Sequence, residues 1–161
     1  MDNSKARCSA FDKAVNLLAF KDRTVQEINI KLKEKGYSSE EVDEAVEKLS
    51  YYGYLNDQRY TISYFKDNAS KKGKKLIVRE LDQKGVDKNV IVDVLDDMNI
   101  DELHVVEDII KRRYASIDLE DDKAYRRLVG YFLRRGFSYD NVRKALRNRS
   151  NCEDLEYFSQ E

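Results

Sequence analysis

The sequence predicts an all-α protein built from three tandem three-helix repeats that form an elongated and curved body. Two observations predict helices. The chain has no proline and only six glycines, which disfavours a turn-rich β-protein, and its apolar residues recur three and four positions apart, as on the core-facing side of a helix. A third observation, an internal repeat, gives the number of units.

A short motif occurs three times and organises the chain. It reads apolar-x-x-basic-Gly-apolar-Ser/Asp and lies at residues 32–38, 81–87 and 132–138. Apolar residues flank each copy at matching distances, which extends the repeat beyond the motif itself. The glycine after a basic last turn predicts a C-cap with positive φ. The Ser or Asp two residues later predicts the start of the next helix, so each copy predicts two helices joined by a tight corner.

The elements follow in order from these signals. In the first repeat, residues 24–27 and 38–41 are predicted capping boxes for the second and third helices. An earlier helix completes each repeat, at about residues 9–21, 57–72 and 101–116. The expected domains are three repeats at 1–56, 57–100 and 101–149, followed by an acidic and loose tail at 150–161 that lacks periodicity.

Composition excludes several classes of protein. The 161 residues carry 30 Lys and Arg against 31 Asp and Glu, a net charge of -1, so the whole chain is not a polycation. No apolar run is long enough to span a bilayer. The first eight residues lack the apolar stretch of a secretory signal, which predicts a cytoplasmic protein. Cys8 and Cys152 lack metal-ligand spacing and are expected to be free thiols. No heptad pattern suggests a coiled coil, so a monomer is expected.

No catalytic site, metal or cofactor is expected. His104 is the only histidine, and no marked partner accompanies it for nucleophilic catalysis. The acidic cluster of Asp93, Asp96 and Asp97 lacks the spacing of a calcium loop. Walker and dinucleotide-binding glycine motifs are absent. The sequence therefore favours a protein that acts by binding.

Local charge segregation points to the kind of partner. Residues 123–149 carry a net charge of +8 and residues 71–79 carry +5, whereas residues 39–49 and 150–161 carry -4 each. Basic stretches of this density are candidate phosphate-binding surfaces. Runs of charge can also be ordinary solvated helix faces, but Asp140 is the one acidic residue in 123–149.

The third repeat is the first candidate for a nucleic-acid contact. Arg127, Tyr131 and Arg134 recur at helical spacing and would place cations and an aromatic ring on one exposed strip, where they could follow a phosphate backbone and stack a base. The second candidate is the lysine cluster at 71–75, at a helix junction where backbone N–H groups could also reach a phosphate. The full set of predicted contact residues is Lys71, Lys72, Lys74, Lys75, Arg79, Arg112, Arg113, Arg126, Arg127, Tyr131, Arg134, Arg135, Arg143, Lys144, Arg147 and Arg149.

Over residues 9–148 the chain resembles the RecX family of regulatory proteins. The most specific stretch is Gly-Tyr-Leu-Asn-Asp at 53–57, followed by the basic, glycine-containing segment at 72–81; residues 33–37, 84–87 and 134–139 also carry the resemblance. The resemblance implies a tandem three-helix fold and a regulator without enzymatic activity. It implies binding to the recombinase RecA on single-stranded DNA, weaker binding to double-stranded DNA, and inhibition of RecA in recombination, DNA repair and the SOS response.

Two other functions are compatible with repeats and charge alone. A three-helix unit can be a helix-turn-helix that reads a DNA sequence with its last helix, for which the basic helix around Arg143 is suitable and the acidic helix at 39–49 is not. A helical-repeat scaffold that binds only proteins is the other alternative. The two strongly basic stretches count against the scaffold.

Overall fold

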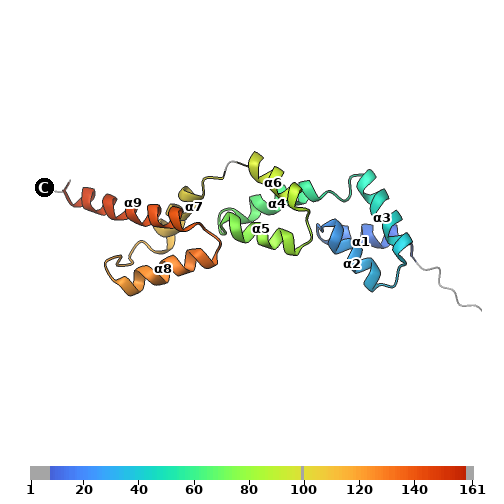
Figure 1. Cartoon of the computed structure of the whole chain (residues 1–161), viewed down its shortest axis with the longest axis horizontal. Coiled ribbons are helices and arrows are strands. Elements are labelled where there is room, and N and C mark those ends of the chain that lie inside the picture. Colours follow the sequence, from blue (N-terminus) through green and yellow to red (C-terminus); the bar gives the residue numbers. More distant parts are fainter. Residues whose placement is uncertain (1–7, 99, 159–161) are drawn as a thin grey trace, which may run out of the picture. The chain divides into compact units, whose positions relative to one another are not determined.

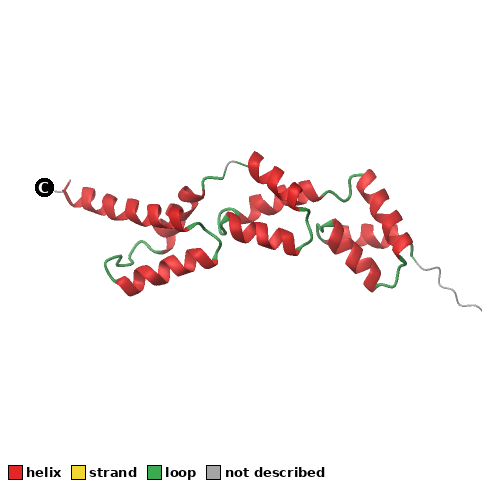
Figure 2. Cartoon of the chain, in the orientation of Figure 1, coloured by secondary structure: helices red, strands yellow, loops and turns green. Residues whose placement is uncertain are grey.

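The structure, a computed structural model, describes residues 8–98 and 100–158, with side chains up to residue 149. In these ranges it contains nine α-helices and no strand (Figure 1, Figure 2). They are α1 (Ala10–Phe20), α2 (Val25–Glu34), α3 (Ser39–Tyr51), α4 (Asp57–Asn68), α5 (Lys74–Gln83), α6 (Lys88–Asp97), α7 (Glu102–Arg113), α8 (Asp122–Arg134) and α9 (Tyr139–Phe158). The predicted all-α class and the three tandem three-helix repeats are confirmed. None of the described helices combines the length and the apolar character needed to cross a membrane.

The local signals read from the sequence form the expected corners and caps. Thr24 and Glu27 make a capping box at the start of α2, and Ser38 and Glu41 make one at the start of α3. The three motif glycines, Gly36, Gly85 and Gly136, have φ of 81°, 75° and 83°. Only glycine adopts this left-handed region without strain, which explains why the motif carries glycine at each corner.

The predicted apolar stripes form the cores. In the first repeat Ala14, Ile28, Leu32, Val42 and Leu49 are fully buried in one cluster. In the third repeat the corresponding cluster contains Leu128, Phe132, Phe137 and Val142. The rings of Phe132 and Phe137 meet edge to face, with centroids 5.6 Å apart. Each of these two repeats therefore has its own hydrophobic core.

Tertiary contacts divide the chain into two compact bodies. The first body contains Met1–Tyr64 and Leu81–Asp97, and the second contains Phe65–Glu80 and Met98–Glu161. Helix α4 passes into the second body after Tyr64, and α5 returns to the first after Glu80. The second repeat therefore contributes to both bodies.

Each body contains one joint between consecutive repeats, and the two joints are built alike. In the first body Thr24 Oγ1 donates to the carbonyl of Lys84 (2.7 Å), and Val25 N–H donates to Asp57 Oδ1 (2.9 Å). At this joint the start of the middle helix α2 thus donates to two groups of the next repeat. One is the carbonyl of the residue just before that repeat's corner glycine, and the other is the carboxylate of the residue that opens that repeat's first helix.

In the second body the matching bonds join Gly73 N–H to the carbonyl of Arg135 (2.9 Å) and Lys74 N–H to Glu102 Oε1 (2.9 Å). Glu102 also accepts from Ser138 N–H (3.2 Å), so one carboxylate caps both α5 and α9. A Cβ on Gly73 would lie 2.3 Å from backbone atoms of Gly136. The second joint is therefore a direct backbone-to-backbone contact.

Some helix ends differ from the sequence prediction. Helix α4 ends at Asn68 rather than near 72, because the N–H groups of Lys71 and Lys72 turn back to the carbonyl of Asn68. Helix α7 ends at Arg113 rather than near 116. The loose tail predicted from residue 150 is instead a helical continuation of α9 as far as Phe158, since no Gly or Pro follows Gly136 to stop it. Residues 159–161 and Asn99 lie outside the described residues.

Candidate nucleic-acid interface

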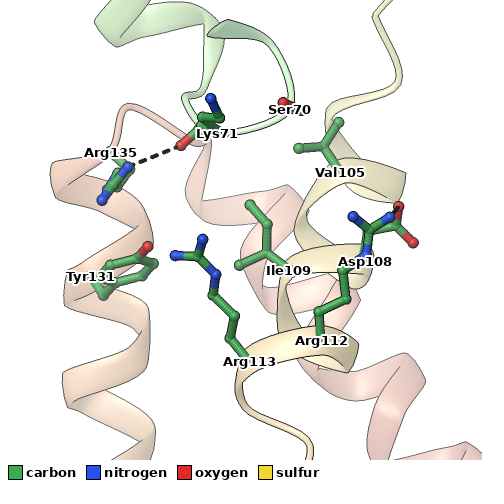
Figure 3. Close-up of a pocket in the computed structure, with 9 residues that line it drawn as sticks. All are labelled: Ser70, Lys71, Val105, Asp108, Ile109, Arg112, Arg113, Tyr131 and Arg135. Atoms are coloured by element: carbon green, nitrogen blue, oxygen red, sulfur yellow. Dashed lines mark hydrogen bonds and ion pairs between the residues drawn. The ribbon is translucent and has the colours of Figure 1, made fainter.

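The second body contains a basic cleft with a volume of about 450 Å³. Three segments that are distant in the sequence line it: the loop between α4 and α5, one face of α7, and the last turns of α8 (Figure 3). The lining residues are Ser70, Lys71, Val105, Asp108, Ile109, Arg112, Arg113, Tyr131 and Arg135. We call the site formed by these nine residues the basic cleft.

The joint between the second and third repeats positions the mouth of the basic cleft. The Gly73 N–H bond to the carbonyl of Arg135 holds the α4–α5 loop against the end of α8. In return, Arg135 Nη1 donates to the carbonyl of Lys71 at 3.4 Å (Figure 3). Lys71 is thereby placed beside residues more than sixty positions further along the chain.

Positive charge dominates the lining. It contains four cations, Lys71, Arg112, Arg113 and Arg135, and among the nine lining residues Asp108 is the one carboxylate. Asp108 Oδ2 accepts from Arg112 Nη2 at 3.0 Å, so its charge is offset locally. The remaining cations favour binding of an anion.

An aromatic ring lies among these cations. The guanidinium of Arg135 lies 5.2 Å from the ring centroid of Tyr131, and Arg113 reaches from α7 toward the same ring (Figure 3). Tyr114 packs edge to face on Tyr131 with centroids 5.6 Å apart. Burial is the main cause that raises the pKa of Tyr114, and the neighbouring Tyr131 raises it further. Its phenol therefore stays neutral at physiological pH and adds no negative charge beside the basic cleft.

This combination of groups suits the backbone of a single-stranded nucleic acid. Guanidinium and ammonium groups bind phosphate oxygens, and an exposed aromatic or guanidinium plane can stack an unpaired base. Val105 and Ile109 supply an apolar wall for the sugar or base.

The structure brings five of the predicted contact residues together in the basic cleft. They are Lys71, Arg112, Arg113, Tyr131 and Arg135. The predicted strip of Arg127, Tyr131 and Arg134 is divided, because Arg127 and Arg134 are exposed on α8 and do not line the basic cleft.

The remaining cations lie on separate surfaces. Arg143 and Arg147 line a smaller hollow of about 230 Å³ with Tyr125, and the adjacent Lys144 is exposed. Arg126, on α8, lies 3.7 Å from a carboxylate oxygen of Asp122. Lys75 and Arg79 are exposed on α5.

Two predicted contact residues have structural partners instead. Arg149 donates to the carbonyls of Tyr114, Ala115 and Ile117 at 2.7–2.8 Å, and so caps the end of α7. Lys72 forms an ion pair with Glu80 at 2.8 Å, with only about a quarter of each side chain exposed. Both cations therefore already have protein partners, and their contact with phosphate stays a prediction.

The helix junction at Lys71–Lys75 is also corrected. Its backbone N–H groups were expected to reach a phosphate, but Gly73 N–H donates to Arg135 and Lys74 N–H donates to Glu102. Protein acceptors therefore already occupy these two donors.

Sequence reasoning missed the other four lining residues, which carry no positive charge: Ser70, Val105, Asp108 and Ile109. The signal for two of them was present, because Val105 and Ile109 are four residues apart on one face of α7. That this face opens onto the α4–α5 loop depends on the joint, which is not visible in the sequence.

Comparison with known proteins adds the family. The chain matches three domain families in order: "RecX, first three-helix domain" over residues 10–49, "RecX, second three-helix domain" over 56–95, and "RecX, third three-helix domain" over 101–146. The chain belongs to the RecX family. These matches confirm the resemblance carried by the sequence motifs.

Relatives and solved structures in the RecX family agree over most of the chain. "Regulatory protein RecX" of Trichlorobacter lovleyi is 34% identical over 151 residues, which cover 89% of this chain and 97% of the relative. The protein of the same name from Vibrio vulnificus is 29% identical and covers 86% and 91%. The crystal structure of RecX from Lactobacillus salivarius has a TM-score of 0.70 at 25% identity, and covers 88% of this chain and 94% of that one.

Proposed function

We propose that this RecX-family protein is a non-enzymatic regulator that binds the RecA filament on single-stranded DNA and lowers its ATPase, strand-exchange and coprotease activities. The family supports a regulatory role, and the basic cleft is the observation that carries the nucleic-acid part of the proposal. The protein would act as a cytoplasmic monomer, in the compartment that contains bacterial DNA, and would need no cofactor.

The basic cleft favours single-stranded over double-stranded DNA. Its half-buried aromatic ring, Tyr131, and the Arg135 guanidinium beside that ring can stack only a base that is not already stacked within a duplex. Its cations bind phosphates of either form without regard to sequence. We therefore expect weaker binding to a duplex, and no preference among sequences.

A second surface supports binding to protein. Helix α3 and the start of α1 enclose a groove of about 490 Å³ lined by Phe11, Glu41, Glu44 and Tyr52, among others. Tyr51 is 85% exposed beside it, and Tyr52 is 63% exposed. Lys48 also lines the groove and lies 2.6 Å from Glu44. Residues 39–49 as a whole carry a net charge of -4, so helix α3 complements a basic surface. Exposed aromatics of this kind mark interaction sites, and we assign this one to a basic surface of RecA.

The assignment of the acidic helix α3 is tested with the triple substitution Glu40→Gln, Glu44→Gln and Glu47→Gln, of which Glu44 lines the groove. We expect weaker binding to RecA and unchanged binding to single-stranded DNA, because the acidic helix is unsuited to phosphate. Unchanged RecA binding would show that the docking surface lies elsewhere.

The function itself is tested by titrating the protein into a DNA-dependent ATPase assay with RecA from the same bacterium. The ATPase rate should fall as the protein concentration rises, and strand exchange should fall in parallel. A flat rate, with the protein demonstrably bound to the filament, would rule out inhibition. Tight binding to one DNA sequence without any effect on RecA would favour a helix-turn-helix regulator instead.

A further inference from the structure

The first body contains a smaller cavity beside its own joint between repeats. Its volume is about 180 Å³, and it is lined by Leu18, Asp22, Arg23, Tyr54, Asn56, Arg59, Tyr60 and Ser63. All of these residues belong to the first body. We call it the Arg23 cavity.

The two sites correspond only in part. With Thr24 aligned on Gly73 and Asp57 on Glu102, the residues that donate and accept across the joints, Asp22 corresponds to Lys71 and Tyr60 to Val105. Arg23, Arg59 and Tyr54 correspond to no residue that lines the basic cleft, so the Arg23 cavity is a separate hollow with its own lining.

The Arg23 cavity is lined by cations and phenols of its own. It has two guanidinium groups, from Arg23 and Arg59, and two phenols, from Tyr54 and Tyr60, with Asp22 as the one carboxylate in the lining. Tyr54 is 54% exposed. The Arg23 cavity is therefore a net positive hollow beside an exposed ring.

One buried donor in this cavity has no acceptor. Arg23 Nε is buried and makes no hydrogen bond with any residue that the structure describes. Buried polar atoms in native proteins are nearly always hydrogen-bonded, since an unpaired one costs about 1–3 kcal/mol. An anion bound in the cavity would supply a hydrogen-bond acceptor for the Arg23 guanidinium.

We propose that the Arg23 cavity is a second phosphate-binding site, which takes a backbone phosphate of single-stranded nucleic acid while the adjoining base stacks outside on Tyr54. The cavity is smaller than the roughly 300 Å³ at which pockets begin to hold a whole small ligand, and this suits a phosphate group alone. The proposal rests on the nucleic-acid binding given under the proposed function, and it adds a second contact site to the chain.

The test compares three substitutions in the first body. Arg59→Ala removes an exposed guanidinium and leaves the backbone bond of Arg59 N–H to Asn56 intact. Arg23→Lys keeps the charge but removes the Nε donor. Lys33→Ala, an exposed cation on α2 that does not line the cavity, is the matched control. Binding to oligothymidine is followed by fluorescence anisotropy over a range of salt concentrations.

We expect Arg59→Ala to flatten the slope of log affinity against log salt by about 0.7, the value for one phosphate contact on a single strand. Arg23→Lys should lower the affinity while it leaves the slope nearly unchanged, and Lys33→Ala should change neither. Circular dichroism and thermal unfolding confirm that each variant folds.

The outcomes separate this inference from the proposed function. If Arg59→Ala and Arg23→Lys behave like the wild type while substitutions in the basic cleft weaken binding, the Arg23 cavity is not a site and the proposed function stands. If Lys33→Ala flattens the slope as much as Arg59→Ala, general surface charge explains binding and the inference is wrong. If substitutions in neither site affect oligothymidine binding, the nucleic-acid part of the proposed function fails as well.

Discussion

Replacing Gly136 with alanine tests whether the second joint depends on direct backbone contact. Gly136 has φ of +83°, and a Cβ there would lie 2.3 Å from the backbone nitrogen of Leu76 and 2.5 Å from its Cβ. Ordinary van der Waals contact begins at 3.4 Å. Backbone atoms of α5 cannot rotate away, so the α8–α9 corner and α5 would have to separate by about one ångström.

Two costs add in this variant. The left-handed conformation costs an alanine roughly 1–2 kcal/mol, and an overpacked contact costs roughly 1–3 kcal/mol more. Gly53→Ala is the matched control, because Gly53 has φ of +74° but no atom within 4 Å of its Cβ position. The control should lose only the stability that the left-handed conformation costs an alanine. Gly136→Ala should therefore lower the free energy of unfolding by about 1–3 kcal/mol more than Gly53→Ala does.

Urea unfolding and hydrogen exchange provide the two readouts. The Gly73 amide, which donates to the carbonyl of Arg135 at 2.9 Å, should exchange faster in Gly136→Ala and at the normal rate in Gly53→Ala. Binding to single-stranded DNA should weaken in Gly136→Ala alone, because the same loop carries Lys71 into the basic cleft. Equal destabilisation by the two substitutions, with unchanged protection at Gly73, would refute the backbone contact.

Three further substitutions test individual residues. Burial raises the pKa of Asp57; the charge of Glu27 adds to this rise, and the hydrogen bond from Val25 N–H opposes it. Ionisation of Asp57 therefore lowers the stability of the folded protein as the pH rises above the ordinary aspartate pKa of about 4. The stability of Asp57→Asn relative to the wild type should therefore increase between pH 4 and pH 7 in urea unfolding, and a constant difference would contradict this. Arg149→Lys keeps the positive charge but removes the guanidinium group, whose two terminal nitrogens donate to three carbonyls. It should cost about 2 kcal/mol and leave the salt slope of DNA binding unchanged, whereas a flatter slope would make Arg149 a DNA contact. Gly130→Ala should stabilise the chain by about 0.5–1 kcal/mol, because only the flexible end of Arg134 lies near the new Cβ, at 3.2 Å; a lower urea midpoint would contradict it.

The sequence was sufficient for the fold because the relevant signals are local. A corner glycine, its preceding basic turn and the following Ser or Asp lie within a few residues of one another, and the apolar stripes repeat every three or four positions. Of the apolar residues that lie six, nine and ten positions after the three corner glycines, Val46 and Leu95 are half-buried and the others are buried. Local chemistry was therefore enough to place the helices and their inner faces.

The joints were not predictable, because their bonds connect distant residues. Glu102 caps α5 through Lys74, 28 positions away, and Arg149 caps the chain after α7 from about 35 positions away. Charge density identified the basic residues but could not distinguish Arg149, which holds a helix end, from Arg113, which lines the basic cleft. Side-chain partners at long range decide which cations are available to a ligand.

The salt dependence of binding to single-stranded DNA tests the central claim most directly, with two double variants that remove equal charge. Lys71→Ala with Arg113→Ala removes two cations of the basic cleft, and Arg143→Ala with Arg147→Ala removes two from the hollow beside α9. If the basic cleft holds the strand, the first variant should flatten the slope of log affinity against log salt by about 1.4, from two contacts of about 0.7 each, and the second should leave the slope unchanged. A normal slope in the first variant with a flattened slope in the second would place the contact on α9 and contradict the account.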